Sequence, residues 1–174
     1  SINHGNCLEL MNGIPDKSVD MILSDLPYGS TQNKWDSVIP LGILWSHYER
    51  VIKDKGAIVL TADGKFTPIL KTSNLELFRY DWIWVKNKTT GFLNANKMPL
   101  RKHEHILVFY KNLPRYNPQK TTGHKPVNAY TKHTTDGSNY GKTEVGITGG
   151  GQTDRYPTSV LPIDVSNNDS VDKF

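Results

Sequence analysis

The fold of this chain is decided by the run Val19-Asp20-Met21-Ile22-Leu23-Ser24 and by the turn that follows it, Asp25-Leu26-Pro27-Tyr28-Gly29. The first six residues are almost wholly apolar and lead directly into the Pro-Tyr-Gly turn. This pattern is typical of a buried parallel strand that opens into a loop. Polar residues at the carboxyl end of such a strand are candidates for a functional site. The sequence therefore predicts a buried strand with Asp25 at its functional end.

The elements on the carboxyl side of this strand alternate in type. After Pro40, apolar residues from Leu41 to Ile52 recur at helical spacing, and the Lys55-Gly56 pair predicts the end of that helix. Residues 57–61 (AIVLT) predict a second buried strand, and residues 65–73 predict a second helix. This order favours an α/β layer in which a right-handed crossover joins two parallel strands.

A change of pattern follows in the second half of the chain. Residues 75–85 alternate between two faces, which predicts a long strand, and residues 105–110 (HILVFY) predict another buried strand. We expect the intervening residues 86–101, rich in Asn, Lys and Thr, to form a loop. Beyond Tyr110, scattered Pro, Gly, Asn and Thr predict irregular or poorly ordered structure.

Bulk properties exclude several classes of protein. No apolar run approaches the roughly 18 residues needed to cross a bilayer, so we expect a soluble chain with no membrane partner. Residues 1–10 do not have the pattern of a secretory signal, and the single cysteine, Cys7, cannot form an internal disulfide. These features favour a cytoplasmic location.

Basic residues are concentrated in one part of the chain. Ten of the 21 Lys and Arg residues lie between Lys86 and Lys132, where Glu104 is the single acid. Such a block is often a solvated surface, and it is equally the composition of a surface that contacts nucleic-acid phosphates. The sequence leaves both interpretations open.

The tetrapeptide Asp25-Leu26-Pro27-Tyr28 has the groups that methylation of an aromatic amine requires. The nitrogen lone pair must be drawn out of conjugation, which needs two acceptors for the amine hydrogens and a flat surface for the base. The Asp25 carboxylate and the Leu26 carbonyl are candidate acceptors, Pro27 would stiffen the turn, and Tyr28 would stack on a flipped base. An ordinary strand-to-turn corner with a capping Asp would have the same pattern.

The surrounding sequence resembles the amino methyltransferases whose signature is Asp/Asn/Ser-Pro-Pro-Tyr, in particular their phage and bacterial branch. The resemblance covers roughly the first 115 residues, although Leu26 departs from the first Pro of the signature. The segments that carry it are Gly5-Asn6-Cys7, residues 14–20 (IPDKSVD), the DLPYG turn, Lys34-Trp35-Asp36, and residues 56–60, 82–86 and 103–110.

This resemblance implies a Rossmann-like α/β methyltransferase sheet in residues 1–110 and an irregular target-recognition segment in residues 111–174. It implies transfer of a methyl group from S-adenosylmethionine (SAM) to double-stranded DNA, at N6 of adenine or, alternatively, N4 of cytosine. Asp25, Leu26, Pro27 and Tyr28 would be catalytic, and Asp25 would also face the donor. No metal is expected. The residues expected on DNA phosphates are Lys86, Lys88, Lys97, Arg101 and Lys102.

The donor-binding motif of this family, Phe-x-Gly-x-Gly after a strand, is missing from the sequence. The family's β-type order would place it downstream of Asp25, because only 24 residues precede Asp25, yet residues 111–174 contain no such pattern. We therefore expect a truncated chain, or one whose donor site is completed by a homodimer or a partner chain. A catalytically silent DNA-binding module is the alternative from another functional class.

Four other features have weaker interpretations. Residues 146–153 (GITGGGQT) have phosphate-loop spacing, but Gln152 replaces the required Lys, which favours a mobile loop. His103-Glu104-His105 lacks a third metal ligand and is expected to be structural or to face DNA. Asp63-Gly64-Lys65, together with Asp16, only faintly resembles the acid-x-Lys core of restriction nucleases, in which carboxylates hold a metal ion. Among the four tryptophans, Trp35 alone is expected to be a candidate for base stacking.

Overall fold

The computed structural model describes residues 2–131 and 148–162. The chain divides into two compact units. The first unit comprises Ser1–Arg115 and Ser159–Phe174, and the second comprises Tyr116–Thr158. All of the predicted catalytic and DNA-contacting residues belong to the first unit.

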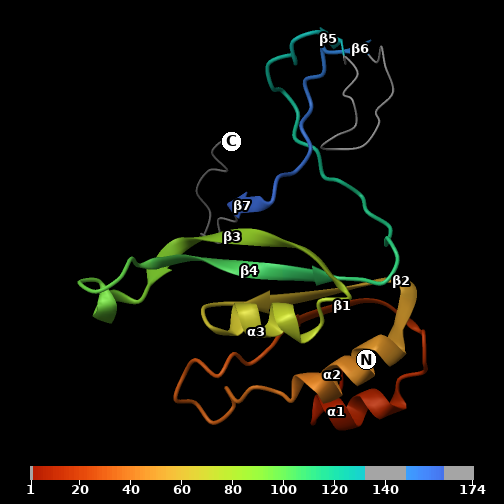
Figure 1. Ribbon diagram of the computed structural model, residues 1–174, viewed down its shortest axis with the longest axis vertical. Coiled ribbons are helices and arrows are strands. Elements are labelled where there is room, and N and C mark those ends of the chain that lie inside the picture. Colours follow the sequence, from red (N-terminus) through yellow and green to blue (C-terminus); the bar gives the residue numbers. More distant parts are fainter. Residues whose placement is uncertain (1, 132–147, 163–174) are drawn as a thin grey trace. The chain divides into compact units, whose positions relative to one another are not determined.

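A five-stranded sheet forms the centre of the first unit (Figure 1). Its strand order is β1-β2-β4-β3-β7. β1 and β2 are parallel, β4 is antiparallel to both of its neighbours, and β7 is parallel to β3. All strands except β4 therefore run in the same direction. The strands are β1 (Val19–Asp25), β2 (Ile52–Ala62), β3 (Phe78–Thr90), β4 (Arg101–Phe109) and β7 (Val160–Pro162).

Two helices, α2 (Leu41–Val51) and α3 (Phe66–Ser73), lie on the same side of the sheet (Figure 1). The Trp45 indole of α2 donates a hydrogen bond of 2.8 Å to the Ser73 hydroxyl of α3. The remaining helical elements are α1 (Cys7–Leu10), η1 (Met11–Gly13) and η2 (Phe92–Asn94). None of the helices that the structure describes is long and apolar enough to cross a membrane.

The hydrophobic core lies between these helices and the sheet. Its fully buried side chains each contribute about 1.5–3 kcal/mol relative to exposure, so this core is the main source of stability. Apolar residues at helical spacing on α2 and at alternating positions on the strands meet there. The largest fully buried side chains are Phe109, Leu44, Ile58, Leu60, Leu70, Leu107 and Val51.

The predicted first strand, first helix, second strand and second helix are present. The burial predicted for the first strand is wrong, because no residue of β1 is buried and Met21 and Leu23 are 54% and 69% exposed. One helix boundary also differs from the prediction. α2 ends at Val51 rather than at the Lys55-Gly56 pair, because residues 52–56 already belong to β2. The backbone N–H groups of Lys17 and Ser18 donate to the carbonyls of Arg50 and Val51, which ties the end of the helix to the chain leading into β1. The helical spacing of apolar residues continues through Ile52 in the sequence, but Ile52 is extended because it pairs with Val19 of β1.

The prediction of a loop over residues 86–101 is wrong in part. β3 continues to Thr90, which pairs with Arg101, so β3 and β4 extend together as a two-stranded arm. The arm residues are largely exposed on both faces and therefore show no apolar alternation in the sequence. The strand predicted from residue 75 begins at Phe78, and the strand predicted from residue 105 begins at Arg101.

Beyond Tyr110 the described residues have little regular structure, as predicted. In the second unit, the two-residue strands β5 (Tyr130–Thr131) and β6 (Thr148–Gly149) form a small antiparallel pair. The sequence did not predict β7, a three-residue strand whose pairing with β3 is long-range. The predicted target-recognition segment lies partly outside the described residues.

Candidate functional site

The candidate site is built at the carboxyl ends of two parallel strands. Asp25 is the last residue of β1, and Thr61 is its register partner on β2. Parallel strands present their carboxyl ends at the same edge of a sheet, where ligands of open α/β folds bind. The structure therefore brings a carboxylate and a hydroxyl together from positions far apart in the sequence. Thr61 was not among the predicted site residues.

A compact hydrogen-bond network orients the Asp25 carboxylate. The Thr61 hydroxyl donates to Oδ1 of Asp25. The Tyr28 hydroxyl lies 2.7 Å from the same oxygen and 2.8 Å from Oγ1 of Thr61, so its proton can be donated to either. Oδ2 of Asp25 has no hydrogen-bond partner among the described residues. One carboxylate oxygen is thus anchored, and the other remains an available acceptor.

The Tyr28 ring is fixed at both ends. It stacks on Phe66 of α3 with ring centroids 5.4 Å apart and an interplanar angle of 24°, while its hydroxyl reaches the Asp25 and Thr61 side chains. Partial burial raises the pKa of the Tyr28 hydroxyl well above its ordinary value, and the Asp25 carboxylate adds to this effect, while the hydrogen bond between Tyr28 and Thr61 opposes it. The hydroxyl therefore stays protonated at neutral pH and acts as a donor.

The two residues between Asp25 and Tyr28 differ in their surroundings. The Leu26 side chain is 6% exposed and packs in the hydrophobic core, whereas Pro27 is partly exposed. Burial of the Leu26 side chain leaves its backbone as the part that can take part in chemistry at the surface. A leucine at this position therefore anchors the turn without occupying the space beside Asp25.

Asp36 is a structural residue of the site that sequence reasoning missed. Its buried carboxylate accepts hydrogen bonds from the backbone N–H groups of Gly29, Ser30 and Thr31, at 2.7 to 2.9 Å. Burial by itself would raise the pKa of Asp36, but these backbone hydrogen bonds outweigh it and hold the pKa below its ordinary value. Asp36 thus fixes the loop that follows Tyr28, and Gly29 begins that loop with a left-handed φ of 66°.

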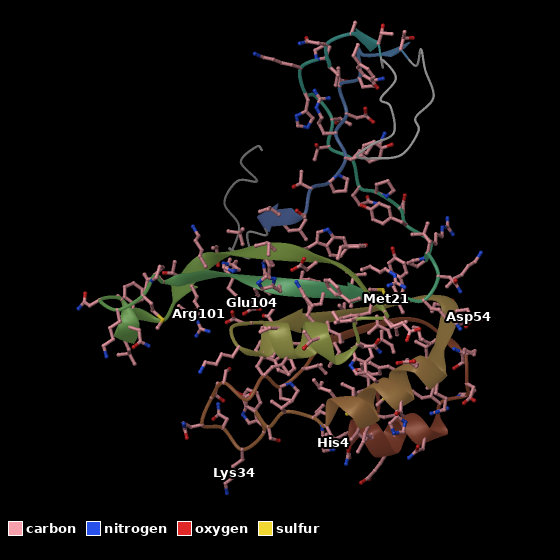
Figure 2. The ribbon with its side chains drawn as sticks, viewed as in Figure 1. His4, Met21, Lys34, Asp54, Arg101 and Glu104 are labelled. Atoms are coloured by element: carbon pink, nitrogen blue, oxygen red, sulfur yellow. The ribbon has the colours of Figure 1, made fainter. Side chains whose placement is uncertain are left out.

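The five predicted DNA-contacting residues all lie on the arm of β3 and β4. Two of them form ion pairs within the chain. Lys86 forms an ion pair with Glu104, and Arg101 pairs with Asp63 at 3.0 Å. Arg101 and Glu104 can be followed along β4 in Figure 2. The other three cations have no ion-pair partner among the residues that the structure describes; they are Lys88, Lys97 and Lys102.

One histidine of the pair on β4, His105, contacts the ion pair between Lys71 and Asp81. Nδ1 of His105 lies 2.9 Å from Oδ2 of Asp81, and the Lys71 ammonium lies 3.1 Å from the same oxygen. Burial would raise the pKa of Asp81, but hydrogen bonds from His105 and Lys71 hold it below its ordinary value. Within residues 2–131 and 148–162, no group of three or more His, Cys, Asp or Glu side chains could hold a metal ion.

The weaker candidate sites are not assembled. Asp63 is paired with Arg101 and Asp16 with Arg50, so the two carboxylates of the nuclease-like pattern serve separate ion pairs. The phosphate-loop-like segment begins outside the described residues. Trp35 is 72% exposed in the loop after the DLPYG turn, as a candidate stacking residue would be.

A small cavity of ≈ 80 Å³ lies at the amino-terminal end of β2 and contains none of the predicted site residues. Because Asp25 and Thr61 lie at the carboxyl ends of their strands, this cavity is remote from the hydrogen-bond network. Its lining includes Lys17, Glu49, Asp54, Tyr110 and Lys111.

Comparison with known proteins establishes the fold of the chain. No protein-family model and no curated protein matches the sequence. Among solved structures, the chain is similar to PvuII DNA methyltransferase (cytosine-N4-specific), with a TM-score of 0.56 and 13% identity over 96% of this chain and 58% of that one. It is also similar to M1.HpyAVI in its complex with SAM, with a TM-score of 0.50 and 19% identity over 70% of this chain and 61% of that one. The chain thus spans about three fifths of the length of each, and the predicted Rossmann-like α/β methyltransferase fold is confirmed.

Proposed function

We propose that this chain is the catalytic and DNA-contacting part of a SAM-dependent DNA methyltransferase that modifies the exocyclic amine of a flipped base, N6 of adenine. The observation that carries the proposal is the state of the Asp25 carboxylate, which has Oδ1 anchored by Thr61 and Tyr28 and Oδ2 available. The similarity in fold to PvuII DNA methyltransferase and to M1.HpyAVI supports the same class of reaction.

In the proposed mechanism, the target amine donates one hydrogen bond to Oδ2 of Asp25 and one to the Leu26 carbonyl. These two bonds draw the nitrogen lone pair out of conjugation with the ring and make the nitrogen nucleophilic. SAM supplies an electrophilic methyl group when it is bound. The nitrogen becomes positively charged as it is methylated, and the Asp25 carboxylate stabilises this charge and accepts the proton that is lost.

Tyr28 provides the flat surface in this mechanism. One face of its ring is covered by Phe66, which leaves the opposite face for a base rotated out of the duplex. The hydrogen bonds of the Tyr28 hydroxyl prevent the ring from turning, so the base would stack at a fixed distance from the Asp25 carboxylate. A preorganised surface of this kind lowers the entropic cost of positioning the amine.

The described residues include groups that can activate the target amine, but they do not include the motif expected to bind SAM. None of the strands that the structure describes is followed by the Phe-x-Gly-x-Gly motif. Asp25 is the residue that we place closest to the donor, because the methyl group must reach the amine held there. A second copy of the chain, or a partner chain, that supplies the donor-binding residues is part of the proposal.

Two alternatives remain specific enough to test. The first is N4 of cytosine, which is supported by the similarity to a cytosine-N4-specific enzyme and opposed by the aspartate at position 25, since the resemblance associates aspartate with adenine. The second is a DNA-binding module without catalysis, which is supported by the missing donor motif. Such a module would bind DNA in a salt-sensitive way and would not bind SAM.

The test is transfer of a labelled methyl group from SAM to unmethylated DNA, followed by digestion and identification of the labelled nucleoside. Labelled N6-methyladenine supports the proposal, and labelled N4-methylcytosine corrects the base. If the chain binds DNA but neither transfers label nor binds SAM, the catalytically silent module is favoured instead. The Asp25→Ala variant is the control, because it should lose transfer while it retains DNA binding.

A further inference from the structure

The tip of the arm, residues 91–100, exposes several large apolar side chains. Leu93 is 101% exposed, Phe92 is 72% exposed and Met98 is 57% exposed. A single exposed apolar residue needs no explanation, but three within one short tip are typical of a surface that contacts another molecule.

This tip is an ordered turn. It begins at Gly91, whose φ of 92° lies in the left-handed region that favours glycine. The backbone N–H of Asn94 donates to the Gly91 carbonyl at 2.9 Å, and the N–H groups of Lys97 and Met98 donate to the Asn94 carbonyl at 2.8 and 3.0 Å. The apolar side chains are therefore presented from a hydrogen-bonded scaffold.

The arm extends past the end of its neighbouring strand. The last pair between β2 and β4 is Ala62 with His105, whereas β3 and β4 continue to the pair Thr90 with Arg101 (Figure 1). At about 3.3 Å per residue, the β3 segment from Ile83 to Thr90 is roughly 23 Å long. The arm is formed by the carboxyl-terminal part of β3, which runs in the same direction as β1 and β2. Asp25 and Thr61 lie near the carboxyl ends of β1 and β2, so the arm projects from the same end of the sheet.

The charge of the arm indicates the chemistry of its partner. Residues 82–103 contain no acidic residue. Lys88, Lys97 and Lys102 have no ion-pair partner among the described residues, so their charges are available to a polyanion. Two asparagines, Asn94 and Asn96, add hydrogen-bonding groups within the apolar tip. Cations around an apolar and amide-bearing tip complement duplex DNA, in which phosphates surround stacked bases.

We propose that the tip inserts Leu93 and Phe92 into the base stack of duplex DNA, in the space that the flipped base leaves, while the arm lysines contact the flanking phosphates. Proteins that kink or open DNA commonly insert apolar side chains in this way, and a two-stranded ribbon is narrow enough to enter the major groove. This inference rests on the proposed function, because the space arises only when a base is flipped out.

The test compares binding of the full chain to two labelled duplexes of identical sequence, one intact and one with a single abasic site that provides the space in advance. The wild-type chain should bind the abasic duplex more tightly. Leu93→Ala and Phe92→Ala should each weaken that binding about tenfold or more, because a buried apolar side chain is lost, and should remove the preference. Leu75→Ala is the matched control, since Leu75 is 63% exposed and lies outside both the arm and the predicted target-recognition segment.

Salt dependence separates the apolar contact from the ionic contacts. The tip variants should leave the slope of log K against log salt unchanged, whereas Lys97→Ala should reduce its magnitude by about 1. Equal binding of both duplexes by the wild type, wild-type behaviour of Leu93→Ala, or the same loss in Leu75→Ala would overturn the proposal. So would Leu93-dependent binding to anionic lipid vesicles with DNA binding unaffected. Because no methyl transfer is measured, failure of the tip contact is distinguishable from failure of catalysis.

Discussion

The hydroxyl of Thr61 donates a hydrogen bond to Oδ1 of Asp25, its register partner across the β1–β2 ladder. The ladder fixes the two backbones, so the distance between these side chains is set by the sheet rather than by a flexible loop. Thr61 therefore acts as a positioning residue in the proposed reaction, because it orients the carboxylate without touching the substrate.

Thr61→Val tests this role with little change in side-chain volume. Loss of one hydrogen bond to a charged group, which contributes about 1.5–3 kcal/mol, should reduce kcat by roughly tenfold to a hundredfold. KM for DNA should change little, because Thr61 is not expected to contact DNA. Thr61→Ser retains the hydroxyl and should restore most of kcat. Equal losses in the Val and Ser variants would show that Thr61 serves packing alone.

The chemistry at Asp25 predicts a different pattern. Asp25→Ala removes both carboxylate oxygens, so the side chain can no longer accept the amine hydrogen or stabilise positive charge on the nitrogen. We expect transfer to fall about a hundredfold or more, the usual effect of losing one preorganised electrostatic group. The dissociation constant for DNA should stay close to that of the wild type, as measured by fluorescence anisotropy. Retained transfer would remove Asp25 from the mechanism.

The sequence predicted the chemistry-bearing turn because its residues are contiguous. Asp25 through Tyr28 follow an apolar strand directly, so local pattern and position in a parallel sheet were enough to single them out. The partners of this turn could not be predicted in the same way. Thr61 reaches Asp25 through strand register, and Phe66 reaches Tyr28 through the packing of α3, and neither relation leaves a local signal.

The arm shows a second limit of sequence reasoning. Hydrophobic alternation identifies strands that have one buried face, but residues 86–90 are exposed on most sides and look like a loop in the sequence. Their strand conformation comes from pairing within the β3–β4 hairpin, which closes at Thr90 and Arg101. The basic composition of this region was visible in the sequence, whereas the internal ion pairs of Lys86 and Arg101 depend on the fold.

The ring and the hydroxyl of Tyr28 make different contacts, so we expect substitutions that remove one or both to have different effects. Tyr28→Phe keeps the ring on Phe66 and loses the hydrogen bonds to Asp25 and Thr61, so kcat should fall about tenfold with little change in binding. Tyr28→Ala removes the stacking surface as well, and stacking contributes about 1–3 kcal/mol per base. The Ala variant should therefore lose affinity for a duplex with a mismatched target base, and the Phe variant should not. Equal affinities in the two variants would contradict a stacking role.

Asp36 predicts a pH-dependent contribution to stability. Its pKa is lowered in the folded chain because the gain from three backbone hydrogen bonds exceeds the effect of burial, so folding favours the ionised form. A carboxylate of this kind stabilises the fold above its unfolded pKa of about 3.9, and the contribution is lost as the pH falls through the folded value. The wild type should therefore melt at a higher temperature than Asp36→Asn near neutral pH, because in either orientation the amide nitrogen cannot accept the backbone N–H bonds that a carboxylate oxygen accepts at that position.

This difference in melting temperature should narrow as the pH drops below about 4, since protonation removes the charge in the wild type, whereas the amide of the Asp36→Asn variant does not titrate. Subtracting the two melting temperatures at each pH cancels the other carboxylates, including Asp81, because they titrate in both proteins. A difference that stays constant from neutral to acidic pH would mean that side-chain shape, and not the ionised carboxylate, holds the loop after Tyr28. In that case Asp36→Asn should also leave methyl transfer unchanged.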